Sequence, residues 1–205
     1  CKKKKIIFFS SPCDYEAVDE LDKIGTKLFK IASFDITDLK LLKYIALKKK
    51  PIIISTGLAS MEDISRAVKV CKSTGNKKII LLECTSIYPA PENIMNLNAI
   101  KNLKNRFKVI TGLSDHSMGD HMILASISLG AKVIEKHFTL NRKMKGPDHS
   151  FAMMPKEFKQ MVLKIRKIES GLGTGIKGKY SKIEKVMAIK SRRSIHVNSN
   201  IKKGE

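Results

Sequence analysis

The chain has 205 residues and carries 40 basic against 19 acidic residues, which gives a net charge of +21. It is 42% hydrophobic, as expected for a globular domain, and it is shorter than the roughly 250 residues of a typical eight-unit α/β barrel. No apolar run approaches the roughly 18 residues that a membrane-spanning helix needs. We therefore expect no transmembrane helix and no membrane partner.

The positive charge is mostly lysine, because only six of the 40 basic residues are arginines. Arginine is the preferred reader of bases and phosphates, and the chain also lacks tryptophan and has only 6% aromatic residues. We therefore interpret the charge as a solvated lysine-rich surface and expect no nucleic-acid partner. A basic protein that binds polyanions or nucleic acid is kept as an alternative.

The four cysteines, Cys1, Cys13, Cys71 and Cys84, have no spacing typical of a zinc site. Reduced thiols in a cytoplasmic protein are the expected state. The chain begins with cysteine and its end is polar, so we expect a piece of a longer protein.

Short apolar runs rich in isoleucine and valine alternate with amphipathic stretches along the chain. Continuous rather than alternating apolarity is typical of strands that are covered on both faces, as in a parallel sheet. Strands are predicted at residues 6–10, 28–33, 51–56, 79–84, 109–114 and 131–137. Helices are predicted at residues 15–24, 39–47, 61–73, 97–105, 120–129 and 155–170, with Ser60 as an N-cap and Pro155 in a first turn.

Chemically capable side chains stand at the end of nearly every predicted strand. They are Ser10, Ser11, Lys30, Ser33, Ser55, Thr56, Glu83, Ser114, Asp115, His116, Glu135 and His137. A barrel draws its catalytic residues from the carboxyl ends of many strands, whereas a doubly wound sheet gathers them at one switch point. The sequence therefore predicts an α/β fold, a partial (β/α)8 TIM barrel of about six units over residues 1–176, about two units short of a full barrel.

Residues 177–205 differ in character, with glycines at the exit from the last predicted helix and an alternating pattern at residues 194–198. Such alternation is typical of a half-buried strand. We interpret this tail as a linker that leads into a second, truncated domain.

Two histidines occupy matching positions in the segments GLSDH and VIEKH. Residues two apart on a strand share a face, so His116 lies with Ser114 and His137 lies with Glu135. Two imidazoles on neighbouring strand ends can hold a divalent metal and leave positions for water and substrate. A single histidine in such a place is more often structural, and the matched pair is what favours a metal site.

Lys30 lies within the apolar run LFKIAS, where an ammonium is costly unless it meets an anion or loses its proton. It could hold a phosphate or carboxylate, form a Schiff base, or extend its ammonium to solvent. Hydroxyls at successive strand ends, those of Ser11, Ser33, Ser55 and Ser114, would suit a small phosphorylated and carboxylated ligand. Asp148 in a Gly-Pro-Asp turn and Tyr88 beside two prolines are further candidates for ligand contact.

The motifs FFSSP, FKIAS, PIIISTG, CTSIYPAP, GLSDH, IEKHFTL and GPDH occur in this order. Together they resemble the sialic acid synthase family, which includes the N-acetylneuraminate, legionaminate and pseudaminate synthases. The resemblance runs from about Phe8 to the end, where SRRSIHVNSNIKKGE is similar to the start of the family's antifreeze-protein-like C-terminal domain.

The resemblance implies a TIM barrel, a homodimer and a requirement for Mn²⁺, with Mg²⁺ or Co²⁺ as alternatives. It also implies a reaction in which phosphoenolpyruvate condenses with an N-acylated amino sugar, such as N-acetylmannosamine, and water, with release of phosphate. By the same resemblance, His116 and His137 are metal ligands. Ser11, Lys30, Ser33, Ser55, Ser86 and Ser114 bind phosphoenolpyruvate, Tyr88, Glu135 and Asp148 contact the sugar, and Asp35 and Glu135 are catalytic.

The family's first two strands and its C-terminal domain contribute further site residues that this sequence does not contain. We therefore expect the 205-residue chain alone to be weakly active or inactive. Rival readings are a Schiff-base pyruvate aldolase, for which Lys30 is the reason, and a deoxy-octulosonate-phosphate synthase. The acceptor sugar stays open, because FKIASFDITDLKLL is similar to pseudaminate synthases and GPDHS to sialate and legionaminate synthases.

Overall fold

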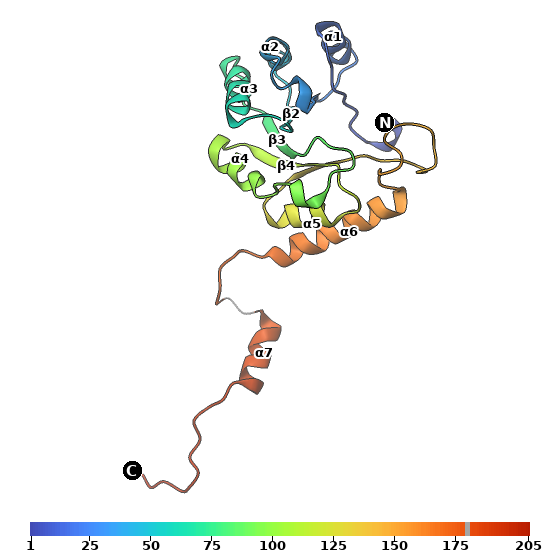
Figure 1. The fold of residues 1–205 in the computed structure, drawn as a ribbon. Helices are drawn as coiled ribbons and strands as arrows, with labels where there is room; N and C mark the ends of the chain where they lie inside the picture. The colour runs from blue at the N-terminus through green and yellow to red at the C-terminus, as the bar shows by residue number, and fades with distance from the viewer. Residues whose placement is uncertain (179–180) are drawn as a thin grey trace. The chain divides into compact units, whose positions relative to one another are not determined.

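The computed structural model describes residues 1–178 and 181–205. It divides into two compact units, Cys1–Gly171 and Leu172–Glu205. The first unit contains a parallel sheet, shown in Figure 1 with its helices in an arc around the strands. In the described chain its strands are β1 (Phe29–Ile31), β2 (Ile52–Ser55), β3 (Ile79–Cys84), β4 (Ile110–Asp115) and β5 (Val133–Lys136).

The strands lie side by side in chain order, and each neighbouring pair is parallel. A doubly wound sheet would reverse its strand order at a switch point, and this five-stranded sheet has no reversal. The described part of the chain thus forms a curled half-barrel, which confirms the parallel α/β architecture and its barrel-like winding.

Helices connect the strands, as the predicted sequence pattern requires. Their bounds are α1 (Tyr15–Lys23), α2 (Leu39–Leu47), α3 (Met61–Ser73), α4 (Ala99–Phe107), α5 (His121–Ser128) and α6 (Pro155–Leu172), with short 3-10 turns η1 (Lys2–Lys4), η2 (Ser33–Asp35) and η3 (Glu92–Ile94). The predicted cap at α3 is confirmed: Ser60 and Asp63 form a reciprocal capping box. None of the helices in the described residues is long and apolar enough to cross a membrane.

The core lies between the sheet and the helices. Alternate strand residues such as Phe29, Ile54 and Leu81 point toward α2 and α3 and are fully buried there. A second cluster packs Leu113 of β4 against α5 and α6, with Met161 as a contact from α6. Because neighbouring residues on a strand face opposite sides, this burial turns Lys30 and Ser55 toward the other side of the sheet, where the candidate site lies.

The predicted strand at residues 6–10 is wrong. Only the Ser10 carbonyl pairs with β1, by accepting from the backbone N–H of Lys30 at 3.1 Å. Ile6, Ile7 and Phe8 are 64%, 58% and 51% exposed, so this segment buries too little apolar surface, and makes too few ladder hydrogen bonds, to be a strand. The expectation of about six βα units becomes five strands in the described residues.

The second unit contains α7 (Lys182–Ser191), where the sequence predicted a linker that leads into a truncated second domain and indicated no helix. The alternating segment at residues 194–198 is not a strand, and Ile195 and Val197 are exposed. Alternation alone does not make a strand when no neighbouring segment offers hydrogen bonds. The antifreeze-like identity of this tail stays a prediction.

Candidate functional site

The carboxyl ends of the strands surround a cavity of about 140 Å³. Strand register places Cys84 of β3 opposite Ser114 of β4, and Ser114 opposite Glu135 of β5. The cavity-facing groups of three strands therefore form one row. The full lining is Lys30, Ala32, Ser33, Phe34, Ser55, Cys84, Tyr88, Ser114, His116, Glu135 and His137.

Lys30 is the buried cation of this cavity. Its Nζ donates to the Ser55 hydroxyl at 2.7 Å and to the Ile31 carbonyl at 2.9 Å, and it lies 3.6 Å from the Glu135 Oε2. Burial lowers the pKa of this ammonium, and the negative charge of Glu135 opposes that effect. Ser114 donates to the other Glu135 oxygen at 2.6 Å. One network thus joins β1, β2, β4 and β5.

His116 is held by its Nδ1, which lies 2.8 Å from the Thr85 carbonyl. Because a carbonyl only accepts, Nδ1 carries the hydrogen in this contact and Nε2 is left for another partner. The Cys84 sulfur lies 3.9 Å from the same nitrogen. Burial acts to lower the pKa of His116, but the hydrogen bonds with Cys84 and Thr85 outweigh it, and the pKa is raised.

His137 faces His116 across the cavity, with the ring centroids 5.4 Å apart. Its Nδ1 lies 3.5 Å from Asp148 Oδ2. Burial lowers the pKa of His137, and the charge of Asp148 opposes this. The ring of Tyr88 completes the wall, 4.1 Å from the His116 ring and 5.7 Å from the His137 ring.

The donor set fits a divalent cation as a two-histidine site. A ligating histidine usually donates its second ring N–H to a carbonyl or carboxylate, and His116 and His137 have such groups at Thr85 and Asp148. Among the described residues, no group of three or more His, Cys, Asp or Glu could hold a metal. The remaining positions on an ion would therefore fall to water or substrate oxygens.

The remaining predicted site residues differ in whether they line the cavity. Ser33 lines the cavity and accepts from the Gly57 N–H at 3.0 Å, and the Ser86 hydroxyl lies 3.8 Å from the Cys84 sulfur. Ser11 donates to the Lys30 carbonyl at 3.0 Å and is not part of the cavity lining. Asp35, in η2, is not part of the cavity lining.

Sequence reasoning named Glu83 as the group at the end of β3, but Cys84 is the residue that lines the cavity. Glu83 shares its face with Ile79 and Leu81, both of which belong to the core beneath the helices. Phe34 and Ala32 also line the cavity, and the sequence analysis assigned neither of them a role in the site. The run IILLEC does not alternate, so no pattern in the sequence separates Cys84 from Glu83.

Comparison with known proteins gives consistent results. A model of the NeuB family matches residues 1–177. An N,N'-diacetyllegionaminic acid synthase of Campylobacter jejuni is 48% identical over 206 residues, which cover 100% of this chain and 61% of that protein. A pseudaminic acid synthase of the same species is 41% identical over 203 residues, 98% of this chain and 58% of that protein.

Solved structures agree. The sialic acid synthetase of Leptospira borgpetersenii, solved with citrate, superposes with a TM-score of 0.86 at 36% identity and covers 93% of this chain and 67% of that one. A truncated 3-deoxy-D-arabino-heptulosonate 7-phosphate synthase of Thermotoga maritima, at 18% identity and a TM-score of 0.73 over 84% of this chain and 69% of that one, shares the fold. The chain spans about three-fifths of the length of its Campylobacter relatives. It belongs to the NeuB family of sialic acid synthase homologues.

Proposed function

We propose that this chain supplies active-site residues of a nonulosonic acid synthase, which condenses phosphoenolpyruvate with an N-acylated amino sugar and water and releases inorganic phosphate. Relatives named as legionaminic and pseudaminic acid synthases support the reaction class. The observation that carries the proposal is the single cavity that joins a buried lysine, hydroxyls, a carboxylate and two imidazoles.

Lys30 and the hydroxyls around it are suited to hold phosphoenolpyruvate. Two of the three Lys30 N–H groups are used by Ser55 and the Ile31 carbonyl. The third is available to an anion, because the Glu135 oxygen is 3.6 Å away, beyond normal hydrogen-bond length. Charge-assisted bonds of this kind are about twice as strong as neutral ones. Ser33 and Ser114 add hydroxyls to the cavity lining. Ser11 and Ser86 complete the proposed set, although neither belongs to that lining.

Glu135, Tyr88 and Asp148 are suited to contact the sugar. Glu135 accepts a hydrogen bond from Ser114 and can accept another from a sugar hydroxyl or hold a proton during the reaction. Tyr88 is 45% exposed as a residue, and Asp148 lies beside His137. Asp35, in η2 beside the cavity residues Ser33 and Phe34, is kept as a further catalytic carboxylate in this proposal.

His116 and His137 would hold the divalent ion, for which Mn²⁺ is the proposal and Mg²⁺ or Co²⁺ the alternatives. When bound, the ion supplies a Lewis acid for the sugar aldehyde. The cavity residues hold C3 of phosphoenolpyruvate against the aldehyde carbon, where the new C–C bond forms. Water adds to C2, and the bond from C2 to the phosphate oxygen breaks. Orienting both substrates contributes on the order of 7–11 kcal/mol at most to lowering the barrier.

Assembly and location belong to the same proposal. We propose that the complete protein is a homodimer in the cytoplasm, in keeping with the reaction and with its expected reduced thiols. The identity of the acceptor sugar stays open, because the names of the relatives include both legionaminic and pseudaminic acid.

Binding of phosphoenolpyruvate to the chain, measured by calorimetry, tests the proposal directly. Lys30→Met is expected to weaken binding at least tenfold, because it removes the buried cation. Lys27→Met removes the same charge from an exposed position three residues earlier and is expected to leave binding within twofold. Equal effects of the two substitutions, or no binding to the unmodified chain, would contradict the proposal. Phosphate release by the full-length protein with a panel of N-acyl sugars then identifies the acceptor.

A Schiff-base pyruvate aldolase is the second candidate, because burial lowers the pKa of Lys30 and a neutral amine is the nucleophile of that chemistry. Borohydride reduction in the presence of pyruvate would trap the imine as a mass increase on Lys30. Trapping at Lys30 would favour the aldolase. Absence of trapping, together with phosphate release that a chelator abolishes, favours the synthase.

A further inference from the structure

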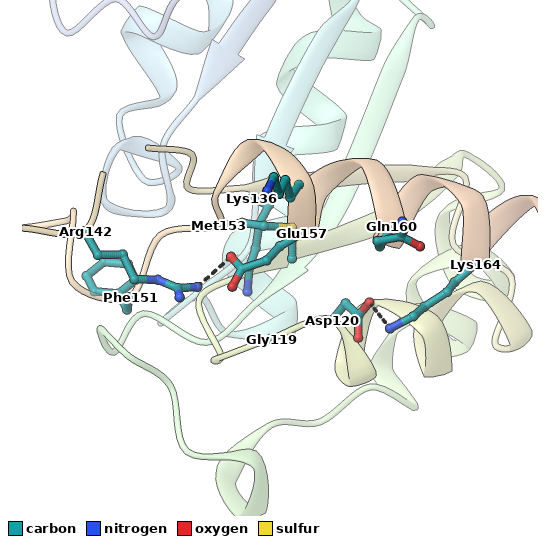
Figure 2. Close-up of a pocket in the computed structure, with 10 residues that line it drawn as sticks. Gly119, Asp120, Lys136, Arg142, Phe151, Met153, Glu157, Gln160 and Lys164 are labelled. Atoms are coloured by element: carbon teal, nitrogen blue, oxygen red, sulfur yellow. Dashed lines mark hydrogen bonds and ion pairs between the residues drawn. The ribbon is translucent and has the colours of Figure 1, made fainter. Parts of the chain in front are cut away.

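A second and larger cavity, of about 310 Å³, lies beside α6 and the start of α5 (Figure 2). Lys136 of β5 lines it, whereas its chain neighbours Glu135 and His137 line the candidate active site. Because successive residues on a strand face opposite sides, the two cavities lie on opposite sides of β5. None of the residues that line this second cavity has a role in the proposed synthase reaction.

The floor of the second cavity is apolar. Phe151 and Met153 line it and are only 5% and 2% exposed, so both side chains are fixed by packing. An apolar cavity of about 150 Å³ can already hold benzene. The space here is sufficient for a ring or a branched chain with a polar substituent.

Most of the charges around this cavity are already paired. Arg142 Nη2 lies 2.7 Å from Glu157 Oε2, and Lys164 Nζ lies 2.8 Å from Asp120 Oδ2, as the dashed lines in Figure 2 show. Lys136 is paired with Asp115 behind the floor. These groups frame the cavity with no net charge of their own.

Lys156 and Gln160 are different. They are four residues apart on α6 and therefore share one face of the helix, and both line the cavity. Within the residues that the structure describes, no hydrogen bond or ion pair engages either side chain. Both residues are exposed, so the cavity has one unpaired ammonium and one unpaired amide at its solvent-exposed rim, above an apolar floor.

We propose that this cavity binds a small monoanion with an apolar body, such as an aromatic carboxylate. The carboxylate accepts hydrogen bonds from the Lys156 ammonium and the Gln160 amide, and the ring packs on Phe151 and Met153. A dianion would have only one unpaired cation to neutralise it here. A cationic ligand would be repelled by Lys156, and no unpaired carboxylate would offset that repulsion. The pattern of free and paired groups therefore selects a single negative charge.

The probe for the test is 4-fluorobenzoate, followed by ¹⁹F NMR with the 205-residue chain, and 4-fluorobenzamide is the neutral probe of the same shape. The carboxylate is expected to bind at least fivefold more tightly than the amide. Lys156→Glu is expected to weaken 4-fluorobenzoate binding about tenfold or more. Lys159→Glu changes the net charge equally from an exposed position on α6 outside the cavity and is expected to leave binding within twofold.

Three outcomes would overturn the proposal. Equal affinities for the two probes would show that charge is not recognised. Equal losses in Lys156→Glu and Lys159→Glu would show attraction to the overall +21 charge rather than to this cavity. Displacement of 4-fluorobenzoate by phosphoenolpyruvate would place the probe in the candidate active site. Each variant is checked for an unchanged unfolding midpoint, and Gln160→Trp, which fills the cavity from the exposed helix face, is expected to abolish binding independently of charge.

Discussion

Lys136 and Asp115 form an ion pair, with Lys136 Nζ 2.6 Å from Asp115 Oδ2, and their side chains are 2% and 0% exposed. The other carboxylate oxygen accepts from the N–H and hydroxyl of Ser117, and Lys136 also donates to the Ser117 carbonyl. The pair therefore joins the ends of β4 and β5 immediately beneath the residues that line the candidate site.

Removal of one partner of this pair should be costly. Lys136→Met leaves Asp115 as a buried, uncompensated charge and is expected to lower the free energy of unfolding by about 3–5 kcal/mol. The double variant Lys136→Met with Asp115→Asn removes that charge and should recover much of the loss. Urea denaturation measures both. Lys164→Met breaks an exposed pair with Asp120 and should cost less than about 1 kcal/mol. A loss of this small size in Lys136→Met would refute the prediction.

The burial of Glu83 should make the stability of the chain depend on pH. Burial raises the pKa of this carboxyl from 4.5 to about 7, so the folded state favours the neutral form. The folded state then binds more protons than the unfolded state between these values, and stability falls as pH rises from about 4.5 through about 7. The total change attributable to Glu83 is on the order of 3 kcal/mol.

Glu83→Gln should remove this component and stabilise the chain at pH 8 more than at pH 5. The comparison of urea midpoints at the two pH values, with the exposed Glu62→Gln on α3 as a control, measures it. A Glu83→Gln variant that keeps the pH dependence of the unmodified chain would show that Glu83 is not the responsible group.

Gly57 allows the hydroxyls at the candidate phosphoenolpyruvate site to approach the backbone. A Cβ at this position would lie 2.1 Å from the Ser86 oxygen and 2.9 Å from the Ser33 oxygen. Gly57→Ala should therefore displace both hydroxyls, cost about 1–3 kcal/mol in stability and weaken phosphoenolpyruvate binding. In the control Gly171→Ala, no atom lies within 4 Å of the added Cβ. This variant should change neither the stability nor phosphoenolpyruvate binding. Combining Gly57→Ala with Ser86→Gly should recover stability, and failure of this recovery would show that the clash lies elsewhere.

The two facing histidines predict binding of a divalent ion. Free Mn²⁺ gives an electron paramagnetic resonance signal that disappears when the ion is bound, so titration of the chain measures its affinity. His116→Ala and His137→Ala should each weaken Mn²⁺ binding tenfold or more. His121→Ala removes an exposed imidazole that pairs with Glu92 and should have no effect. Retention of full Mn²⁺ affinity in His116→Ala would remove the central assignment of this site.

Sequence alone determined the parallel α/β architecture, since apolar runs such as residues 52–54 need burial on both faces whatever their neighbours are. It also identified the chemically capable residues, because Lys30 lies in an apolar run and His116 and His137 occupy matching positions at two predicted strand ends. Local patterns sufficed for these predictions because burial and capping act over a few residues. The family resemblance came from ordered motifs, and the comparison with relatives confirmed it.

Only the tertiary structure decided which of these residues meet. Residues 6–10 are as apolar as a strand, but strand formation depends on hydrogen bonds to a neighbour, and only Ser10 makes one with β1. Ser11 gives its hydroxyl to the Lys30 carbonyl, and Cys84 rather than Glu83 faces the cavity because the register across β3, β4 and β5 fixes which side each residue takes. The pairing of Lys136 with Asp115, and the free ammonium of Lys156 above an apolar floor, likewise arise from contacts between segments far apart in the sequence, which no local pattern encodes.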